Sequence, residues 1–171
     1  MKQSAAWVVQ FRSDFAAAEL LLQKADATTY CQAISKYQQT VEKSVKAMVA
    51  AVNDLGSDLT VTASHLPVTE IDSLLQLRRV IDNVSVDRLA QIFRQHRLAV
   101  EGLCKLAPKW PEDGQSFARN TEYPFVIDGK WSAPAVDGAF TLQETVNAQI
   151  TARAFHKAAI TFVEAVKLGR S

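Results

Sequence analysis

The sequence predicts an all-α protein, an antiparallel up-and-down bundle of about five helices. Apolar residues recur every three or four positions over long stretches, and mostly short connections join these stretches. No convincing run alternates polar and apolar residues, as a half-buried strand would. We therefore expect one helical domain over residues 1–171, with helices at roughly 5–25, 29–55, 70–82, 86–106 and 142–167.

The first two expected helices carry the longest apolar stripes. The stripe of the first is Trp7, Phe11, Phe15, Ala18 and Leu22. The second repeats the spacing at Tyr30, Ile34, Tyr37, Val41, Val45, Met48, Val52 and Leu55. Gly56 then supplies a C-terminal stop. Glu42 precedes Lys46 by four residues, which predicts an ion pair on the solvent side of this helix.

The third and fourth helices follow a loop. Residues 57–68 lack a helical period and are expected to form that loop. Thr69 and Ser85 resemble N-terminal caps, and Pro108 ends the fourth helix. The apolar residues of the third helix are Ile71, Leu74, Leu75 and Ile81. Those of the fourth are Leu89, Ile92, Phe93, Val100 and Leu103.

Residues 108–140 differ in character from the rest of the chain, because they gather four of its five prolines and two of its three tryptophans. They show no sustained period, so we expect a long irregular loop, and such a loop within a compact domain usually has a function or is mobile. Thr141 and Glu144 then match a capping box at the start of the last helix. Its expected apolar face is Val146, Ile150, Phe155, Ala158, Phe162 and Val166.

Composition excludes several classes of protein. Apolar residues make up 48% and charged residues 22%, as in ordinary globular domains. The formal net charge of +1 gives no general attraction to nucleic acid or to a membrane surface. Cys31 and Cys104 lack the paired spacing of a metal site and are expected to be buried, reduced thiols. With no signal peptide and no bilayer-spanning stretch, we expect a cytoplasmic protein without a metal or cofactor and without a membrane partner.

The stretch 16–55 resembles the first two helices of HEPN domains. The likeness consists of an Ala/Leu-rich helix, a turn with an aromatic residue, and a helix bearing Gln38, Gln39, Glu42, Lys43 and Lys46. Family members place a Gln-rich turn and Glu-Lys-x-x-Lys at these positions. The segment 119–124 is similar to the Arg-Tyr-Pro-containing segment that many members place before their last helix. Residues 57–85 resemble the family less well. Family members often have a Thr-His-Asp-Leu-like segment in this region, and residues 64–66 are the nearest match to it.

The resemblance implies a homodimer, a nucleotide or RNA ligand and, in many members, RNA cleavage without a metal. Those ribonucleases use an Arg followed by a His after four to six intervening residues. Here Arg88 precedes His96 with seven intervening residues and Arg153 precedes His156 with two, so the motif is absent. Arg88, His96 and Arg119 are kept as substitute catalytic candidates. The alternative for His96 is a core or interface residue, because it falls on the apolar stripe.

Two further groups of residues are candidates for ligand binding. Segment 78–109 has an excess of positive charge, which suits phosphate-bearing ligands but also an ordinary solvated helix face. In the long loop, Arg119, Asn120, Tyr123 and Asp128 mix donors, acceptors and aromatic surface. They predict a ligand or partner site, or a structural plug in which Arg119 pairs with a carboxylate. Lys43 and Lys46 would line a groove or simply pair with Glu42.

Three functional hypotheses follow. The first is a non-catalytic HEPN-like binding module, the partner of a small nucleotidyltransferase in a bacterial toxin–antitoxin or stress-response pair. The second is a divergent, metal-independent HEPN ribonuclease. The third is a helical protein-interaction domain outside the family. Whether the protein is an enzyme at all stays open at this stage.

Overall fold

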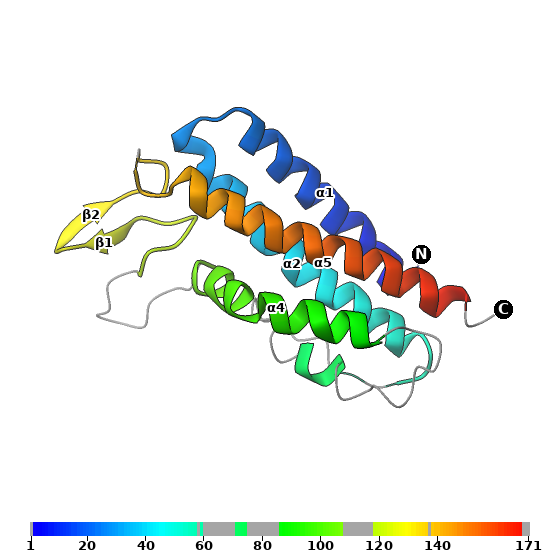
Figure 1. The fold of residues 1–171 in the computed structure, drawn as a ribbon. Coiled ribbons are helices and arrows are strands. Elements are labelled where there is room, and N and C mark those ends of the chain that lie inside the picture. Colours follow the sequence, from blue (N-terminus) through cyan, green and yellow to red (C-terminus); the bar gives the residue numbers. More distant parts are fainter. Residues whose placement is uncertain are drawn as a thin grey trace.

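The computed structural model describes residues 2–57, 59, 71–74, 86–107, 118–136 and 138–168, and it confirms the predicted all-α bundle. Its helices are α1 (Gln3–Gln23), a 3₁₀ turn η1 (Ala27–Thr29), α2 (Tyr30–Asn53), α4 (Val86–Lys105) and α5 (Leu142–Leu168). In Figure 1, α1 and α4 run one way, and α2 and α5 run the other. Residues 71–74 are helical, as expected, but the rest of the predicted helix 70–82 lies outside the described residues.

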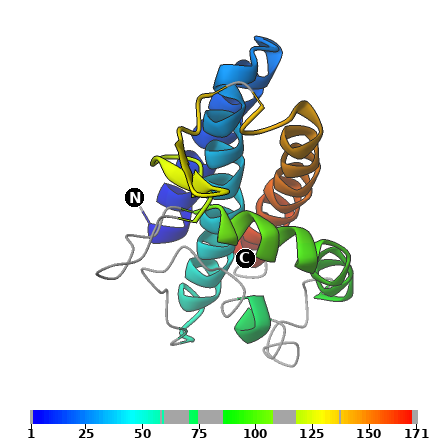
Figure 2. The same ribbon diagram turned by 90° about the vertical axis from the view of Figure 1, so that its left-hand side faces the viewer.

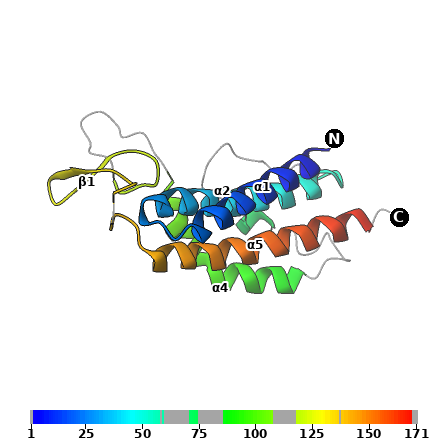
Figure 3. The same ribbon diagram turned by 90° about the horizontal axis from the view of Figure 1, so that it is seen from above.

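Helix α2 lies at the centre of the bundle. It packs against α1, α5 and α4, and Figure 3 shows α1 and α2 together on one side of α5. Its predicted apolar stripe from Tyr30 to Val52 is buried. Leu55 was wrongly assigned to this stripe: it is 45% exposed, because the helix ends at Asn53. Such central placement forces polar residues of α2 into the interior together with the apolar ones.

The buried face of α5 differs from the predicted one at one position. Ile150 is 55% exposed. The buried stripe instead passes through Ala148, Ala152, Phe155, Ala159, Phe162 and Val166. Ile150 is two positions from both Ala148 and Ala152, which places it about 200° around the helix from them. Small alanines on this stripe allow the backbone of α5 to approach α2 closely.

A β-hairpin lies within the segment that was expected to be an irregular loop. Strands β1 (Phe125–Ile127) and β2 (Lys130–Ser132) pair antiparallel, with Val126 opposite Trp131. The turn residues Asp128 and Gly129 have φ values of 49° and 75°, and a two-residue type I′ turn needs positive φ at both positions. The prediction of a loop without strands was therefore wrong here. Figure 2 looks onto the end of the bundle that carries the hairpin, which projects beyond the helices in Figure 1.

None of the helices in the described part of the chain combines the length and the apolar character needed to cross a lipid bilayer. Cys31 and Cys104 are both buried and form no disulfide with each other, as the sequence predicted.

Candidate functional site

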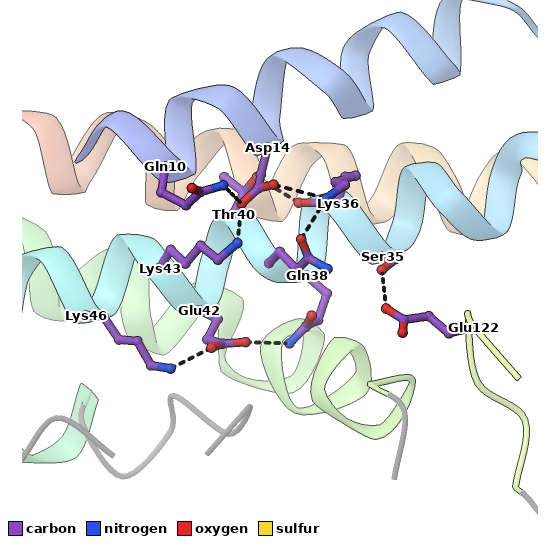
Figure 4. Close-up of polar contacts among 11 residues, drawn as sticks. Gln10, Asp14, Ser35, Lys36, Gln38, Thr40, Glu42, Lys43, Lys46 and Glu122 are labelled. Atoms are coloured by element: carbon purple, nitrogen blue, oxygen red, sulfur yellow. Dashed lines mark hydrogen bonds and ion pairs between the residues drawn. The ribbon is translucent and has the colours of Figure 1, made fainter. Parts of the chain in front are cut away.

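A strip of buried polar residues runs along one face of α2. It consists of Ser35, Gln38, Glu42 and Lys46, each less than a tenth exposed. Gln38 Nε2 donates to Glu42 Oε2 at 3.3 Å, and Lys46 Nζ donates to Glu42 Oε1 at 2.6 Å (Figure 4). The spacing of four residues brings these groups together along the helix. We call these four residues the α2 polar strip.

The ion pair between Glu42 and Lys46 was predicted on the helix surface, and this was wrong. The Lys46 side chain is only 7% exposed and the Glu42 side chain 6%. The Lys46 ammonium lies 5.5 Å from the centre of the Trp7 ring on α1, so an aromatic face covers it as well. The pair is buried because α2 is central in the bundle, which four-residue spacing alone does not reveal.

Lys43, the other lysine of the signature, belongs to a second cluster about 100° around α2 from Glu42. Its Nζ donates to Asp14 Oδ2 at 2.5 Å, while Lys36 Nζ donates to Asp14 Oδ1 at 3.2 Å. Gln10 Nε2 also donates to this carboxylate. Asp14 is 3% exposed and comes from α1, so the cluster joins the two helices (Figure 4). Lys43 therefore pairs with Asp14 and not with Glu42.

A third polar cluster centres on Glu19 of α1. Its carboxylate accepts hydrogen bonds from the Tyr37 hydroxyl at 2.8 Å and from Gln149 Nε2 at 2.7 Å. Arg153 Nη2 donates to it at 3.1 Å. Burial raises the pKa of Tyr37 above its ordinary value, and the bond to Glu19 raises this pKa further. This cluster ties α1, α2 and α5 together through groups that are distant in the sequence.

Arg119 fills a structural role at the start of α5. Its guanidinium pairs with Glu144 at 2.8 and 3.1 Å, donates to the carbonyl of Ala139, and stacks 4.2 Å from the centre of the Phe140 ring. The carboxylate partner that one of the two predicted alternatives gave Arg119 is therefore present, and the alternative of a ligand or partner site stays a prediction. Glu144 also completes the predicted capping box, because it accepts from the N–H of Thr141 at 2.9 Å and its own N–H donates to the Thr141 hydroxyl.

Glu144→Gln is expected to lower the free energy of unfolding by about 1 kcal/mol at pH 7, since glutamine can still cap the helix but loses the charge opposite Arg119. The bond from Arg119 holds the pKa of Glu144 below its ordinary value of 4.5, with a further contribution from Thr141 against the opposing effect of burial. This contribution is present above pH 4.5 and is lost as the pH falls through the lowered pKa. Urea unfolding should therefore show that the free energies of unfolding of wild type and Glu144→Gln become equal as the pH is lowered from 7 to 3. Glu164→Gln, at an exposed position of α5, is the control and should show no such convergence.

Asn120 also has a structural role. It is 4% exposed, and its side-chain oxygen accepts from the backbone N–H groups of Glu122 and Tyr123 at 2.9 and 2.7 Å. Glu122 in turn accepts from the Ser35 hydroxyl of the α2 polar strip at 3.1 Å. The segment before the hairpin is thereby held against α2. Asn120 shapes a turn, and its side-chain oxygen is occupied by the backbone of that turn.

Two of the candidate ligand-binding residues in segment 108–140, Tyr123 and Asp128, are exposed. Asp128 is exposed in the hairpin turn and Tyr123 is 39% exposed. Large apolar side chains accompany them: Trp131 is 69% exposed, Val136 50% and Leu142 51%. We call Tyr123, Trp131, Val136 and Leu142 the hairpin-end residues. Trp131 of β2 is one of the two tryptophans counted in segment 108–140, and its exposure is known only from the structure.

Of the two catalytic candidates on α4, Arg88 and His96, the structure describes the side chain of His96. His96 is half-buried, with its ring centre 6.4 Å from that of Phe155 in an edge-on arrangement. Arg97 pairs with Asp72 and Glu101, and Arg94 donates to the carbonyl of Ala90. The side chain of Arg88 lies outside the described residues, as does His65. Residues 78–85 and 108–109 of the basic segment lie there too.

His156 of α5 packs against α1 in an arrangement that the sequence did not predict. His156 lies between Phe11 and Phe15, with ring centres 5.2 and 4.8 Å away. Burial lowers the pKa of His156 below its ordinary value of 6.5, and the charges of Arg12 and Lys157 lower this pKa further. Arg12 and His156 are far apart in the sequence, so no local motif could have paired them.

Among the residues that the structure describes, no group of three His, Cys, Asp or Glu side chains is placed to hold a metal ion. Comparisons with protein-family models, curated proteins and solved structures found no match. The HEPN resemblance therefore stays a prediction that is based on the residues of the sequence.

Proposed function

We propose that this chain is a non-catalytic HEPN-like binding module that holds a partner protein. The observation that carries the proposal is the set of hairpin-end residues, above all Trp131, which is 69% exposed on a projecting hairpin. Tryptophan and tyrosine are enriched at the centres of protein interfaces, where they contribute most of the binding energy. Trp131 lies opposite Val126 in the hairpin, yet more than two thirds of its surface stays open to a partner.

The base of the hairpin supports a binding role because it is held firmly. Phe125 of β1 is completely buried, and Arg119 fixes the segment to Glu144. Asn120 shapes the turn that leads into β1. A surface that is already ordered loses less conformational entropy when a partner binds.

The partner that the family resemblance implies is a small nucleotidyltransferase, in a bacterial toxin–antitoxin or stress-response pair, with the module itself a cytoplasmic homodimer that contacts nucleotide. Three residues of the resemblance, Gln38, Glu42 and Lys46, are linked by hydrogen bonds along α2. These bonds join successive turns of α2, so their role is then to support that helix. Arg119 would hold the binding surface in place, since its donors are already used within the chain.

Trp131→Ser is expected to weaken binding of a nucleotidyltransferase encoded beside this chain at least tenfold, since central interface tryptophans are typically worth about 2 kcal/mol or more. Biolayer interferometry with the purified partner measures the change in Kd. Leu98→Ser is the matched control, because Leu98 is 83% exposed on α4, away from the hairpin. An equal Kd for wild type and Trp131→Ser would show that the hairpin is not the binding surface.

One assay separates this proposal from a divergent ribonuclease. Labelled RNA is incubated with the protein in excess chelator, using wild type, His96→Ala and Arg119→Ala. A binding module leaves the RNA intact in every case. Cleavage by wild type that either substitution abolishes would overturn the proposal and establish a rearranged, metal-independent site.

A further inference from the structure

The outer edge of strand β2 has no strand beside it. The described part of the chain contains a single sheet of two strands, so each strand is paired on one side only (Figure 2). The edge of β1 is the less accessible of the two, because Phe125 is completely buried and Val126 is half-buried. In β2, by contrast, Lys130 and Trp131 are both exposed. The edge of β2 is therefore the one that another chain can reach.

The register of the hairpin decides which backbone groups lie on this edge. Ile127 and Lys130 flank the two-residue turn, and a flanking pair of this kind exchanges two hydrogen bonds across the hairpin. Hydrogen-bonded and non-hydrogen-bonded pairs alternate in an antiparallel ladder, so the next pair, Val126 and Trp131, is non-hydrogen-bonded. The backbone N–H and C=O of Trp131 consequently point away from β1. Among the described residues, no other backbone group pairs with them.

The side chain of Trp131 lies on the outward face of the hairpin. Side chains alternate along a strand, so Trp131 and Val126 share one face, while Lys130 lies on the face of the buried Phe125. Trp131 thus offers an open pair of backbone groups and a large apolar surface, 69% exposed, at the same place. An added strand uses both at once, because the residue opposite Trp131 exchanges hydrogen bonds with its backbone and packs on its ring.

Lys130 adds a preference for negative charge in such a strand. Its side chain is exposed and forms no ion pair within the described residues. A carboxylate directly opposite it would make a favourable cross-strand pair. A second copy of β2 does not supply this carboxylate, because antiparallel pairing about Trp131 places Lys130 of one copy opposite Ser132 of the other. The charge of the edge therefore favours a different chain.

We propose that the outer edge of β2 takes up an extended segment of the partner protein as a third strand, with an apolar residue opposite Trp131 and an acidic residue opposite Lys130. This inference rests on the binding role proposed above for the hairpin-end residues, and it names the kind of segment that they bind. Main-chain hydrogen bonds give such a contact its affinity, and the side chains give it specificity. A third strand also stabilises a sheet that has only two short strands by itself.

The test is amide hydrogen exchange followed by NMR, on the isotope-labelled chain alone and with a saturating amount of a purified nucleotidyltransferase encoded beside it. The N–H of Trp131 is open in the free chain, and in the complex its exchange should slow about tenfold or more. The N–H groups of Lys130 and Ser132 point toward β1 and are the internal references, since they are hydrogen-bonded in both states.

Each other result has a distinct meaning. A complex in which the N–H of Trp131 exchanges as fast as in the free chain would overturn strand addition and leave the binding surface in place. No complex at all would overturn the proposed function and this inference with it. Slower exchange of this N–H in the chain alone, as its concentration is raised, would identify a second copy as the occupant of the edge and overturn the proposal.

Two substitutions of Trp131 separate the contribution of its backbone from that of its ring. Trp131→Thr and Trp131→Pro both remove the indole, but proline also removes the outward N–H, and edge strands tolerate proline at such positions. We expect Trp131→Pro to bind the partner about fivefold more weakly than Trp131→Thr, through the loss of one hydrogen bond. Slow exchange of the Ser132 N–H in both variants shows that the hairpin is intact. Equal Kd values for the two variants would overturn the proposal.

Lys130→Glu tests the charge of the incoming segment. It is expected to weaken binding about fivefold, because it places a negative charge opposite an acidic residue. Lys105→Glu, at an exposed position of α4, is the matched control and should leave the Kd unchanged. Equal Kd values for wild type and Lys130→Glu would overturn the assignment of an acidic residue to this position.

Discussion

Replacing Phe155 by alanine is expected to lower the free energy of unfolding by about 3–5 kcal/mol. Phe155 of α5 is completely buried, and its ring stacks on Phe93 of α4 with centres 5.2 Å apart and planes inclined by 22°. Alanine removes the whole ring and leaves a cavity where α4 meets α5. Few neighbouring groups can fill this cavity without moving α4, so the cost should be near the upper end of the range.

Urea unfolding followed by far-UV circular dichroism measures this loss. Ile150→Ala on the same helix is the control, since Ile150 is 55% exposed and its loss should cost less than about 0.5 kcal/mol. Phe155→Leu keeps much of the volume and should be less damaging than Phe155→Ala. Equal losses for Phe155→Ala and Ile150→Ala would show that α4 and α5 do not pack as described.

Lys46→Ala is expected to lower the free energy of unfolding by about 3 kcal/mol or more, because it leaves the buried carboxylate of Glu42 without its cation. The two charged atoms are 2.6 Å apart, and both side chains are less than a tenth exposed. Restoring water to Glu42 would require opening the packing around α2. This loss of stability is much larger than the contribution of an exposed ion pair on a helix, which is typically about 0.3–0.5 kcal/mol.

The double variant Glu42→Leu with Lys46→Met should lose less stability than Lys46→Ala alone, because both charges leave the interior together. Lys105→Ala on α4 is the control for removing an exposed lysine. Thermal and urea unfolding of the four proteins gives the comparison. If Lys46→Ala were no more damaging than Lys105→Ala, the buried character of this ion pair would be refuted.

Strands β1 and β2 were not predicted from the sequence, and the reason is their length. Asp128-Gly129 is a strong turn signal, and it stands between short stretches that contain Phe125 and Trp131. Each strand has only three residues, too few to display an alternating pattern. The Asp128-Gly129 pair therefore predicts the hairpin by itself, although the strands show no alternating pattern.

The sequence by itself determined the four long helices of the described chain, the α2 stripe from Tyr30 to Val52, and the cap at Thr141 and Glu144. These features depend on contacts three or four residues apart, which a linear pattern records. Only the tertiary structure decided which polar residues are buried and which charged groups meet. Glu42 and Lys46 enter the interior because other helices surround α2, and Arg119 meets Glu144 across the whole hairpin segment. Arg12 and His156 come together because α1 and α5 pack side by side, and local spacing carries no information about such distant neighbours.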